Sequence, residues 1–354
     1  MNTASQLGAS VSVFGDWVFT TQFTGSGDDF RAQAVSALQA LLSAAGAAGL
    51  PGERFIHSNV MLSDLSQLEI FLGIYRELVG PLLPTISFVP ERRLIDGSLV
   101  GIEVFGAKGD TPIERFYGES DFDGVPSLIR FGEYGFSSSI LSPAPGAFDA
   151  ECRGSMDRLL RAMAEGGFEK RHFAKNLVLI TDCANFNAYN AVYAEYYDVR
   201  EDPPARSLYG VSALPGGRQV SVETVAYLGA KQQLQVENGP KIALPFCHAT
   251  RIGDLVLISG QIGLLGRDQM SLEFGPQTVQ MLKNVALIAE AAGSRAGDYL
   301  KFNGFVTDLA NAEVFRALFR EQFPDCSGAA PLYEVNGLAH SFIIVEMDAV
   351  SFIR

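Results

Sequence analysis

The most regular feature of the hydrophobic and polar pattern is a group of segments that recurs three times along the chain. Each group opens with a short apolar strand that follows an aromatic or apolar residue, a glycine and an acidic residue, which is typical of a turn that feeds a β-strand. The three copies are FGDWVFTTQ from Phe14, FGEYGFSSS from Phe131 and IGDLVLISGQ from Ile252. The recurrence predicts a chain built from three related segments.

A helix is expected after each of these strands, because the next segment has apolar residues at the spacing of one helix face. These apolar positions run from Ala34 to Ala45, from Met156 to Met163 and from Val279 to Ala289. Glycine follows all three segments and Pro276 opens the third, as expected for the ends and starts of helices.

Each predicted helix leads into a second strand, a second amphipathic helix and a final alternating strand. The second strands end in Ser/Thr-Asp, as NVMLSD, LVLITD and NGFVTD, and the final strands are LVGIEVFG, QVSVETVA and FIIVEMDAV. The second helices are SQLEIFLGIYREL, NFNAYNAVYAEYY and NAEVFRALFREQF. The aspartates Asp64, Asp182 and Asp308 recur at intervals of 118 and 126 residues, close to one third of the 354-residue chain.

We predict three tandem modules, residues 1–109, 110–230 and 231–354, each with the element order β-β-α-β-α-β-β. Helices on one face of an antiparallel or mixed sheet make the fold class α+β. The other sheet face still carries apolar residues, so we expect the three sheets to bury these faces against each other around a pseudo-threefold axis. The predicted protein is a monomer that imitates a homotrimer.

Composition and charge narrow the possible partners. The chain has 47% hydrophobic residues, and 27 Lys and Arg against 40 Asp and Glu give a formal net charge of −13. Phosphate backbones and anionic membranes are therefore repelled, and nucleic acid is not an expected partner. No apolar stretch is long enough to span a membrane, and the first residues lack the pattern of a signal peptide. We expect a soluble, cytoplasmic protein.

Cysteine and histidine spacing gives no sign of a metal site or a disulfide framework. The four cysteines are far apart, without a C-x-x-C pair or a matching histidine spacing, so four reduced thiols are expected. They are Cys152, Cys183, Cys247 and Cys326. No glycine-rich turn of the dinucleotide-binding type follows a strand. We expect no cofactor and no metal.

Two of the segments resemble a known family. The LVLISGQIGLL strand, the QTVQMLKNVALIAEAAG helix and FVTDLANAEVFRALFREQF, together with PPARSLYGVSALPGGRQVSVETVA of the second module, are similar to the reactive intermediate deaminase (Rid, or YjgF-like) superfamily. The resemblance implies a chorismate-mutase-like α+β barrel trimer with ligand sites between subunits. It also implies hydrolysis of enamines or imines to keto acids and ammonia, with an arginine that binds the substrate carboxylate.

Arg206 is the residue that matches the family's arginine. A buried guanidinium presents a rigid fork of donors that fits a carboxylate. The first module has Ile86 at this position, and the third has no arginine between Ser327 and Val335. Only one carboxylate-binding arginine is therefore expected.

The family's catalytic glutamate falls two residues before a second acid on the final strand. Only the third module keeps this pair, as Glu346 and Asp348. The corresponding pairs are Ser221 with Glu223 and Gly101 with Glu103. We therefore predict one composite site between modules two and three, with Arg206 and Glu346 as its catalytic residues. Glu103 and Glu223 are expected to be structural remnants.

Further residues are expected to bind the substrate. Phe246 lies 13 residues before the strand serine Ser259, where the resemblance places an aromatic residue, although the usual hydroxyl is missing. Asn190 matches the family's asparagine on the second helix, and Gly260 and Gln261 complete the strand end. Three tyrosines at helical spacing are expected to be packing residues. They are Tyr189, Tyr193 and Tyr196.

Chorismatases are a second family that the chain resembles. They are similar to fused Rid-like modules of about this length, with one active site and a C-terminal strand glutamate that donates a proton to the enol ether of chorismate. PFCHATRIGDLVLISGQIGLLG and IIVEMDAV match the corresponding parts, whereas the PARS segment is closer to Rid proteins.

The predicted function is general acid/base proton transfer on a small carboxylate-bearing metabolite, in enamine or imine hydrolysis or tautomerisation. A chorismatase-like enol-ether hydrolase and a non-catalytic ligand-binding protein are the alternatives, and a pathway of secondary metabolism is one setting. A glutamate in a dry pocket suits the acid/base role, because burial raises its pKa. An endoribonuclease activity is least compatible with a net charge of −13.

Overall fold

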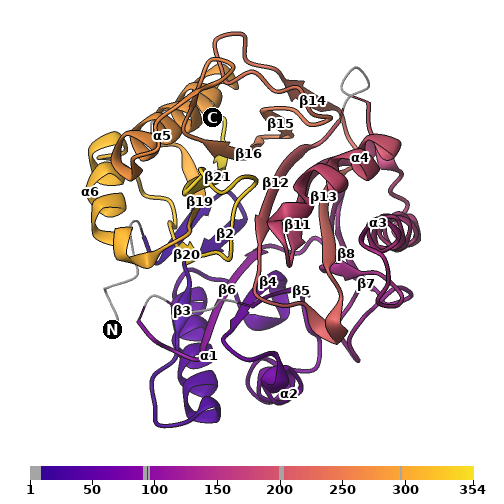
Figure 1. The fold of residues 1–354 in the computed structure, drawn as a ribbon. Helices are drawn as coiled ribbons and strands as arrows, with labels where there is room; N and C mark the ends of the chain where they lie inside the picture. The colour runs from indigo at the N-terminus through magenta and orange to yellow at the C-terminus, as the bar shows by residue number, and fades with distance from the viewer. Residues whose placement is uncertain (1–8, 91–93, 95, 199–202, 296) are drawn as a thin grey trace.

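Hydrogen bonding joins the strands into three large sheets in the part of the chain that the structure, a computed structural model, describes: residues 9–90, 94, 96–198, 203–295 and 297–354. Each sheet comes from one stretch of the chain, and Figure 1 shows the three sheets around the middle of the molecule with their helices on the outside. The α+β fold class is confirmed.

The first sheet has the strand order β1-β2-β6-β4-β5, and β3 pairs with β6. Its strands are β1 Val11–Phe14, β2 Trp17–Thr20, β3 Phe23–Thr24, β4 Phe55–Leu62, β5 Thr85–Pro90 and β6 Val100–Ala107. The second sheet has the order β12-β11-β13-β9-β8-β7, and β10 pairs with β13. Its strands are β7 Ile113–Phe116, β8 Leu128–Phe131, β9 Tyr134–Ser137, β10 Ile140–Leu141, β11 Phe173–Ile180, β12 Ala205–Gly210 and β13 Val220–Tyr227.

The third sheet has the order β14-β15-β16-β21-β19-β20. Its strands are β14 Lys231–Leu234, β15 Ala249–Ile252, β16 Leu255–Ile262, β19 Tyr299–Val306, β20 Leu332–Glu334 and β21 Val345–Phe352. A small separate hairpin follows β16, formed by β17 Leu264–Leu265 and β18 Gln269–Met270. The final strand was expected from Phe342 but begins at Val345, because the preceding segment turns away, where Ala339, His340, Phe342 and Ile343 line a cavity.

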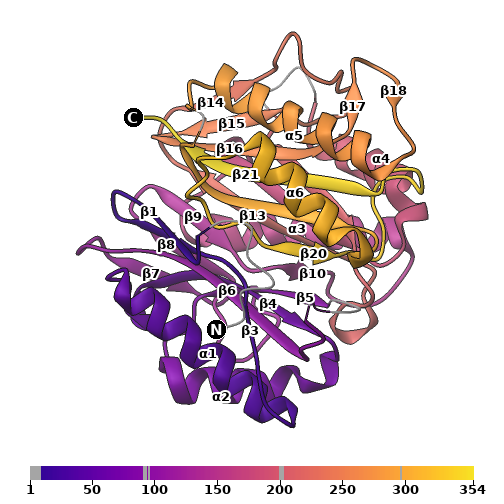
Figure 2. The same cartoon turned by 90° about the vertical axis from the view of Figure 1, so that its left-hand side faces the viewer.

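Two helices lie on the outward face of each sheet, as the two views in Figures 1 and 2 show. They are α1 Phe30–Ala47 and α2 Leu68–Val79, α3 Phe148–Glu165 and α4 Phe186–Tyr196, and α5 Phe274–Ala291 and α6 Ala312–Gln322. The recurring aspartates explain how the second helix of each pair starts. The carboxylates of Asp64, Asp182 and Asp308 each accept a hydrogen bond, at 2.8–2.9 Å, from the backbone N–H two residues on, which caps a short 3₁₀ turn before the α-helix.

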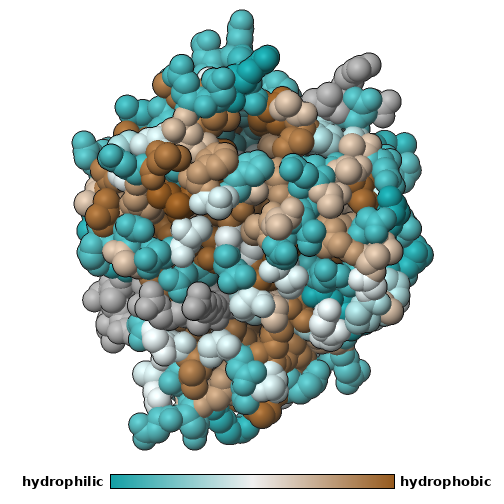
Figure 3. Space-filling view, in the orientation of Figure 1, coloured by the Kyte–Doolittle hydropathy of each residue, from teal (hydrophilic) through white to brown (hydrophobic). Residues whose placement is uncertain are grey.

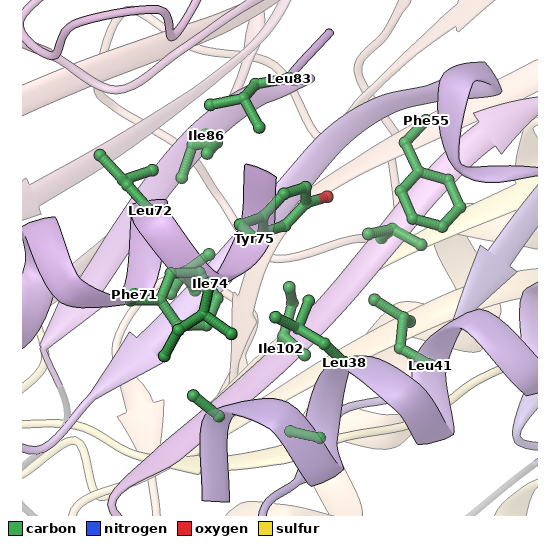
Figure 4. Packing of buried hydrophobic residues seen from close by; sticks show 14 of the residues in the cluster. Leu38, Leu41, Phe55, Phe71, Leu72, Ile74, Tyr75, Leu83, Ile86 and Ile102 are labelled. Carbon is green, nitrogen blue, oxygen red and sulfur yellow. The ribbon is translucent and has the colours of Figure 1, made fainter. Parts of the chain in front are cut away.

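Apolar side chains fill the space between each sheet and its helices. Figure 4 shows this cluster for the first sheet, with Phe71 and Leu38 from its two helices packed towards Ile102 of β6. Another buried cluster joins Met61 of β4, Leu179 of β11 and Phe305 of β19, so the three sheets also contact each other through apolar residues.

The outer surface mixes polar and apolar residues, and on the face drawn in Figure 3 the hydrophobic patches are separated by hydrophilic ones. In the described residues, no helix is both long enough and apolar enough to cross a membrane.

Candidate functional site

Arg206 lies on β12, on the side of the second sheet that meets the third. Its position is fixed by the backbone, because β12 runs parallel to β11 with Arg206 opposite Asn176, and the Arg206 N–H donates to Ser259 Oγ of β16 at 2.9 Å. The guanidinium donates to Asn190 Oδ1 of α4 at 2.8 Å, and the residue is 4% exposed. Two elements of the second sheet region and one strand of the third therefore hold this arginine in place.

Aromatic rings enclose the guanidinium of Arg206. The carbon Cζ lies 4.5 Å from the ring centroid of Phe246, 4.9 Å from that of Tyr193 and 5.8 Å from that of Tyr189. These distances are those of cation–π contacts. Tyr189 and Tyr193 therefore border the arginine, in addition to packing in the core, whereas Tyr196 lies elsewhere and donates to Asp157 at 2.8 Å.

The buried charge of Arg206 is not neutralised by a carboxylate. Burial lowers the pKa of Arg206 from its usual value, and the nearby tyrosines and Glu346 oppose that shift. Among the residues that the structure describes, no acidic side chain forms a salt bridge with Arg206, and Asn190 Nδ2 and Tyr189 Oη have no hydrogen-bond partner. A buried cation with idle donors beside it favours binding of an anion.

Glu346 lies on β21, between Ile262 of β16 and Phe305 of β19 in the strand register. Burial, reinforced by the negative charge of Asp348, raises the pKa of Glu346 to about 8. Arg206, Lys175 and the backbone N–H of Leu208 act in the opposite direction. The carboxyl group can therefore hold a proton at neutral pH and donate it, which is what a general acid requires.

The strand end Ser259-Gly260-Gln261 supports the site with its backbone and its shape. A β-bulge separates Ile258 from Gln261 in the pairing of β16 with β21. Ser259 is fully buried, and its hydroxyl donates to Cys247 O at 2.5 Å while it accepts from Arg206 N. A side chain at Gly260 would place its Cβ 1.9 Å from Glu346 Oε1, so the glycine leaves room for this carboxyl group.

A cavity of about 480 Å³ joins these residues. Five of the predicted site residues line it: Arg206, Phe246, Gly260, Gln261 and Glu346. The other two, Asn190 and Ser259, do not line the cavity but form hydrogen bonds with Arg206. All seven residues predicted for the site are thus brought together. The sequence did not predict the rest of the wall, which comes from two irregular segments and from single positions of α4, β12, β16 and the hairpin β17–β18. These residues are Phe186, Leu208, 240–244, Ile262, Leu264, Arg267, Asp268, Met270, Ala339, His340, Phe342 and Ile343.

Comparison with known proteins identifies the family. The sequence model of the family Endoribonuclease L-PSP matches residues 132–228 and 236–353, which are more than half of the chain. The chain belongs to the endoribonuclease L-PSP family. Both matched stretches lie after the first sheet, and together they contain every residue predicted for the site.

Relatives of this endoribonuclease L-PSP family protein match one third of its chain at a time. A RutC family protein of Pyrococcus horikoshii is 27% identical over 124 residues, which are 34% of this chain and 98% of the relative. The 2-iminobutanoate/2-iminopropanoate deaminase of Escherichia coli K12 is 29% identical over 124 residues, 34% of this chain and 97% of the enzyme. The predicted resemblance to the Rid superfamily is confirmed.

A solved chorismatase structure resembles most of the fold. It aligns with 84% of this chain and 93% of its own, with a TM-score of 0.60 and 14% sequence identity. At this identity the likeness concerns the fold alone, and it supports a chorismatase-like architecture.

The first sheet of this family member has an apolar residue in place of Arg206. Ile86 of β5 lies opposite Ser58 of β4, as Arg206 lies opposite Asn176, and its N–H donates to Ser138 Oγ at 2.9 Å. Ile86 is fully buried in the core cluster, between Leu72 and Leu83 in Figure 4. Next to it, the hydroxyls of Ser139 and Ser221 bond each other at 2.8 Å, at the positions of Gly260 and Glu346. At these two positions the corner therefore has neither an arginine nor an acid, and the charged residues nearby, Arg158 and Asp121, bond each other and the backbone of Leu141.

The remaining corner, where the third sheet meets the first, is filled by side chains. Gly101 of β6 has the place of Glu346, and a Cβ there would lie 2.7 Å from Leu94 Cδ2 and 2.8 Å from Gln22 Nε2. Ala330 stands where Arg206 would be, because Ala329 bridges Lys301 just before it. No titratable pair of the Arg206–Glu346 kind exists at this corner of the described chain.

A second polar cluster lies in the centre, where strands of all three sheets line a cavity of about 120 Å³. Lys301 Nζ bonds Glu103 Oε2 at 2.5 Å, and Lys175 Nζ lies 3.0 Å from Asp348 Oδ2. Glu103, expected to be a remnant, therefore forms an ion pair between sheets. Glu223 accepts from the Ser87 hydroxyl, and burial raises its pKa to about 8.

His57 occupies the place in β4 that Lys175 and Lys301 have in their strands, and burial lowers its pKa to about 4. Because a neutral imidazole supplies no positive charge there, Glu223 forms no salt bridge in the described residues, and Lys175, which lies close enough to lower the pKa of Glu223, pairs with Asp348. The three carboxylates of the centre thus share two lysines, and the third carboxyl group is stable when protonated.

Proposed function

We propose that the protein is an enzyme that acts on a carboxylate-bearing metabolite by general acid/base proton transfer, at one composite site formed by Arg206 and Glu346. The proposal includes three tandem modules, residues 1–109, 110–230 and 231–354, that form an intramolecular pseudo-trimer. The observation that carries it is the cavity in which a buried guanidinium, with no salt bridge in the described part of the chain, lies beside a carboxyl group whose pKa is raised to about 8.

In the proposed reaction, Arg206 binds the substrate carboxylate through its free guanidinium edge, while Asn190 holds the opposite edge. For an enamine, Glu346 donates its proton to the carbon next to the imine carbon, which gives an iminium ion. The Glu346 carboxylate then takes a proton from a water molecule as the water oxygen attacks the carbon of the C=N bond, which gives a carbinolamine. Proton transfer to nitrogen and cleavage of the C–N bond release ammonia, so enamine and water yield keto acid and ammonia.

Hydrolysis of an enol ether is the second candidate, because the chorismatase likeness covers 84% of the chain. The same residues could serve it: Glu346 would protonate the terminal carbon of the enol ether, and water would add to the resulting oxocarbenium ion. The hemiketal would lose a proton from its hydroxyl group and break its ether C–O bond, which releases a keto acid and an alcohol. The family name refers to an endoribonuclease, but a chain of net charge −13 repels a polyanionic RNA.

The test is turnover of 2-aminoacrylate and longer enamines generated in the assay, and of chorismate, by the wild type and by Glu346→Gln. We expect Glu346→Gln to lower turnover by about 100-fold or more, because glutamine keeps the shape and removes the transferable proton. Glu223→Gln is the matched control, since both carboxyl groups have a pKa of about 8 but Glu223 faces the central cavity. Full turnover in Glu346→Gln, or a complete loss in Glu223→Gln, would contradict the proposal.

A further inference from the structure

The size of the site cavity is the first sign of what it binds. At about 480 Å³ it has room for roughly 16 water molecules, at about 30 Å³ each. The deaminase of Escherichia coli that resembles part of this chain is named for imino acids of three and four carbons. Such acids would leave most of this cavity to solvent, whereas cavities of roughly 300–1,000 Å³ take larger organic ligands.

Only two of the charged residues that line the cavity in the described chain are buried. Arg206 and Glu346 are the buried charged residues of its wall, with 4% and 5% exposure. Lys241, Arg267 and Asp268 also line the cavity but are exposed, and the Lys241 ammonium already donates to Glu237 O at 2.6 Å. The buried part of the site therefore has one place for one carboxylate.

The remainder of the wall is apolar and partly aromatic. Phe186, His340 and Phe342 form a continuous row, with ring centroids 5.4 Å apart for the first pair and 5.3 Å apart for the second. Phe342 is 48% exposed, although an apolar side chain of this size is usually covered. Aliphatic side chains complete this wall: Ile242, Leu244, Ile262, Leu264, Met270 and Ile343.

Buried amides hold the irregular segments of this wall in place. Gln277 of α5 donates to Ser271 O at 2.8 Å and to Phe342 O at 3.0 Å, and accepts from Ile344 N at 2.8 Å. Asn284, about two turns further along the same face of α5, donates to Ile262 O at 2.9 Å and to Leu264 O at 2.8 Å. Because both side chains are almost fully buried, the loop 339–343 and the hairpin β17–β18 are anchored to the helix and the cavity is preformed.

We propose that the substrate is a monocarboxylate with a large apolar body of about the size of an aryl group. Its carboxylate binds Arg206, its reacting carbon faces Glu346, and its body lies along the row Phe186, His340 and Phe342. This inference rests on the proposed function, because it takes from it that the substrate carboxylate binds Arg206. The new part is the chemical class of the rest of the substrate.

The test is calorimetric binding of pyruvate, 4-methyl-2-oxopentanoate, phenylpyruvate and chorismate to the full chain. We expect phenylpyruvate to bind at least tenfold more tightly than pyruvate, because its ring buries additional apolar surface. Phe342→Ser should remove most of this preference. Leu82→Ser is the matched control, since Leu82 is 51% exposed but lies outside the cavity, and should leave the preference unchanged.

The outcomes separate this inference from the proposed function. Equal affinity for pyruvate and phenylpyruvate, with binding that still depends on Arg206, would overturn the substrate class and leave the proposed function standing. Tighter binding of the dicarboxylate chorismate that is lost in Arg267→Ala would also overturn it, because a second anion site would then exist. Binding of every ligand unchanged in Arg206→Ala would overturn the proposed function itself.

Discussion

Gly260→Ala is expected to inactivate the proposed site while the protein still folds. The new Cβ would lie 1.9 Å from Oε1 and 2.8 Å from the carboxyl carbon of Glu346, whereas Cβ contacts under 3.0 Å are essentially absent from real structures. The carboxyl group must therefore move by about 1 Å or more. It can do so at little cost to stability, because it is the end of a flexible side chain. A displacement of 1 Å can cost about 100-fold in rate.

The assay compares turnover, carboxylate affinity and the free energy of unfolding for the wild type and Gly260→Ala. Turnover should fall by about 100-fold, with carboxylate affinity changed by less than about threefold, because the fork of Arg206 is untouched. Gly73→Ala in α2 is the control, since its Cβ would meet no atom within 4 Å. Turnover of Gly260→Ala within a few-fold of the wild type would show that the position of Glu346 does not limit the reaction.

Three other predictions concern binding, pH and assembly. Arg206→Ala should weaken carboxylate binding by about 2–4 kcal/mol in calorimetry, because a buried charge-assisted pair is lost. Ile86→Ala should leave carboxylate binding unchanged but lower the free energy of unfolding by about 2–5 kcal/mol in denaturant titration. The pKa of Glu223 is about 8 in the folded protein and 4.5 ordinarily, so the protonated carboxyl group stabilises the folded state at low pH. This stabilisation is lost as the pH rises from about 4.5 to about 8, because the unfolded chain then releases the proton more readily than the folded protein. Glu223→Gln should flatten the pH dependence of the unfolding free energy in that window, and an unchanged slope would contradict the assignment. Light scattering should give a monomer of 38.2 kDa, and a stable trimer of this chain would contradict an intramolecular pseudo-trimer.

The helices, the main strands and the close approach of Arg206 and Glu346 could be anticipated from the sequence. The helices and strands follow from local periodicity, and the Asp64-type caps mark where each second helix starts. The two site residues are far apart in the chain, but each occupies a defined place in a strand. Strand register then determines which residues face the same cavity.

The rest of the site depends on contacts that no local pattern contains. Phe186 starts a helix, and His340 and Phe342 lie in a loop, so only the tertiary structure shows that their rings form one wall. Tyr189 and Tyr193 have the spacing of packing residues, and their contact with Arg206 depends on how α4 lies against β12. Such contacts are long-range, which is why they could not be read from the chain alone.

The ion pairs of the central cavity were also not foreseen. Lys175 and Lys301 lie in strands that are mostly apolar, and nothing in either strand indicates that its lysine meets an acid of another sheet. Glu103 was therefore expected to be a remnant, although it forms an ion pair with Lys301. In the described residues its counterpart Glu223 forms no ion pair, since β4 carries a histidine at the equivalent place.

The most direct test of the Arg206–Glu346 site is a crystal structure of the protein with a bound 2-oxo acid. We expect the carboxylate oxygens to lie within about 3 Å of two nitrogens of the Arg206 guanidinium, the spacing of a bidentate pair. We also expect the 2-oxo carbon on the side of the Glu346 carboxyl group. A ligand held by Lys241 or Arg267 at the mouth of the cavity, with the Arg206 guanidinium free, would contradict the proposed site.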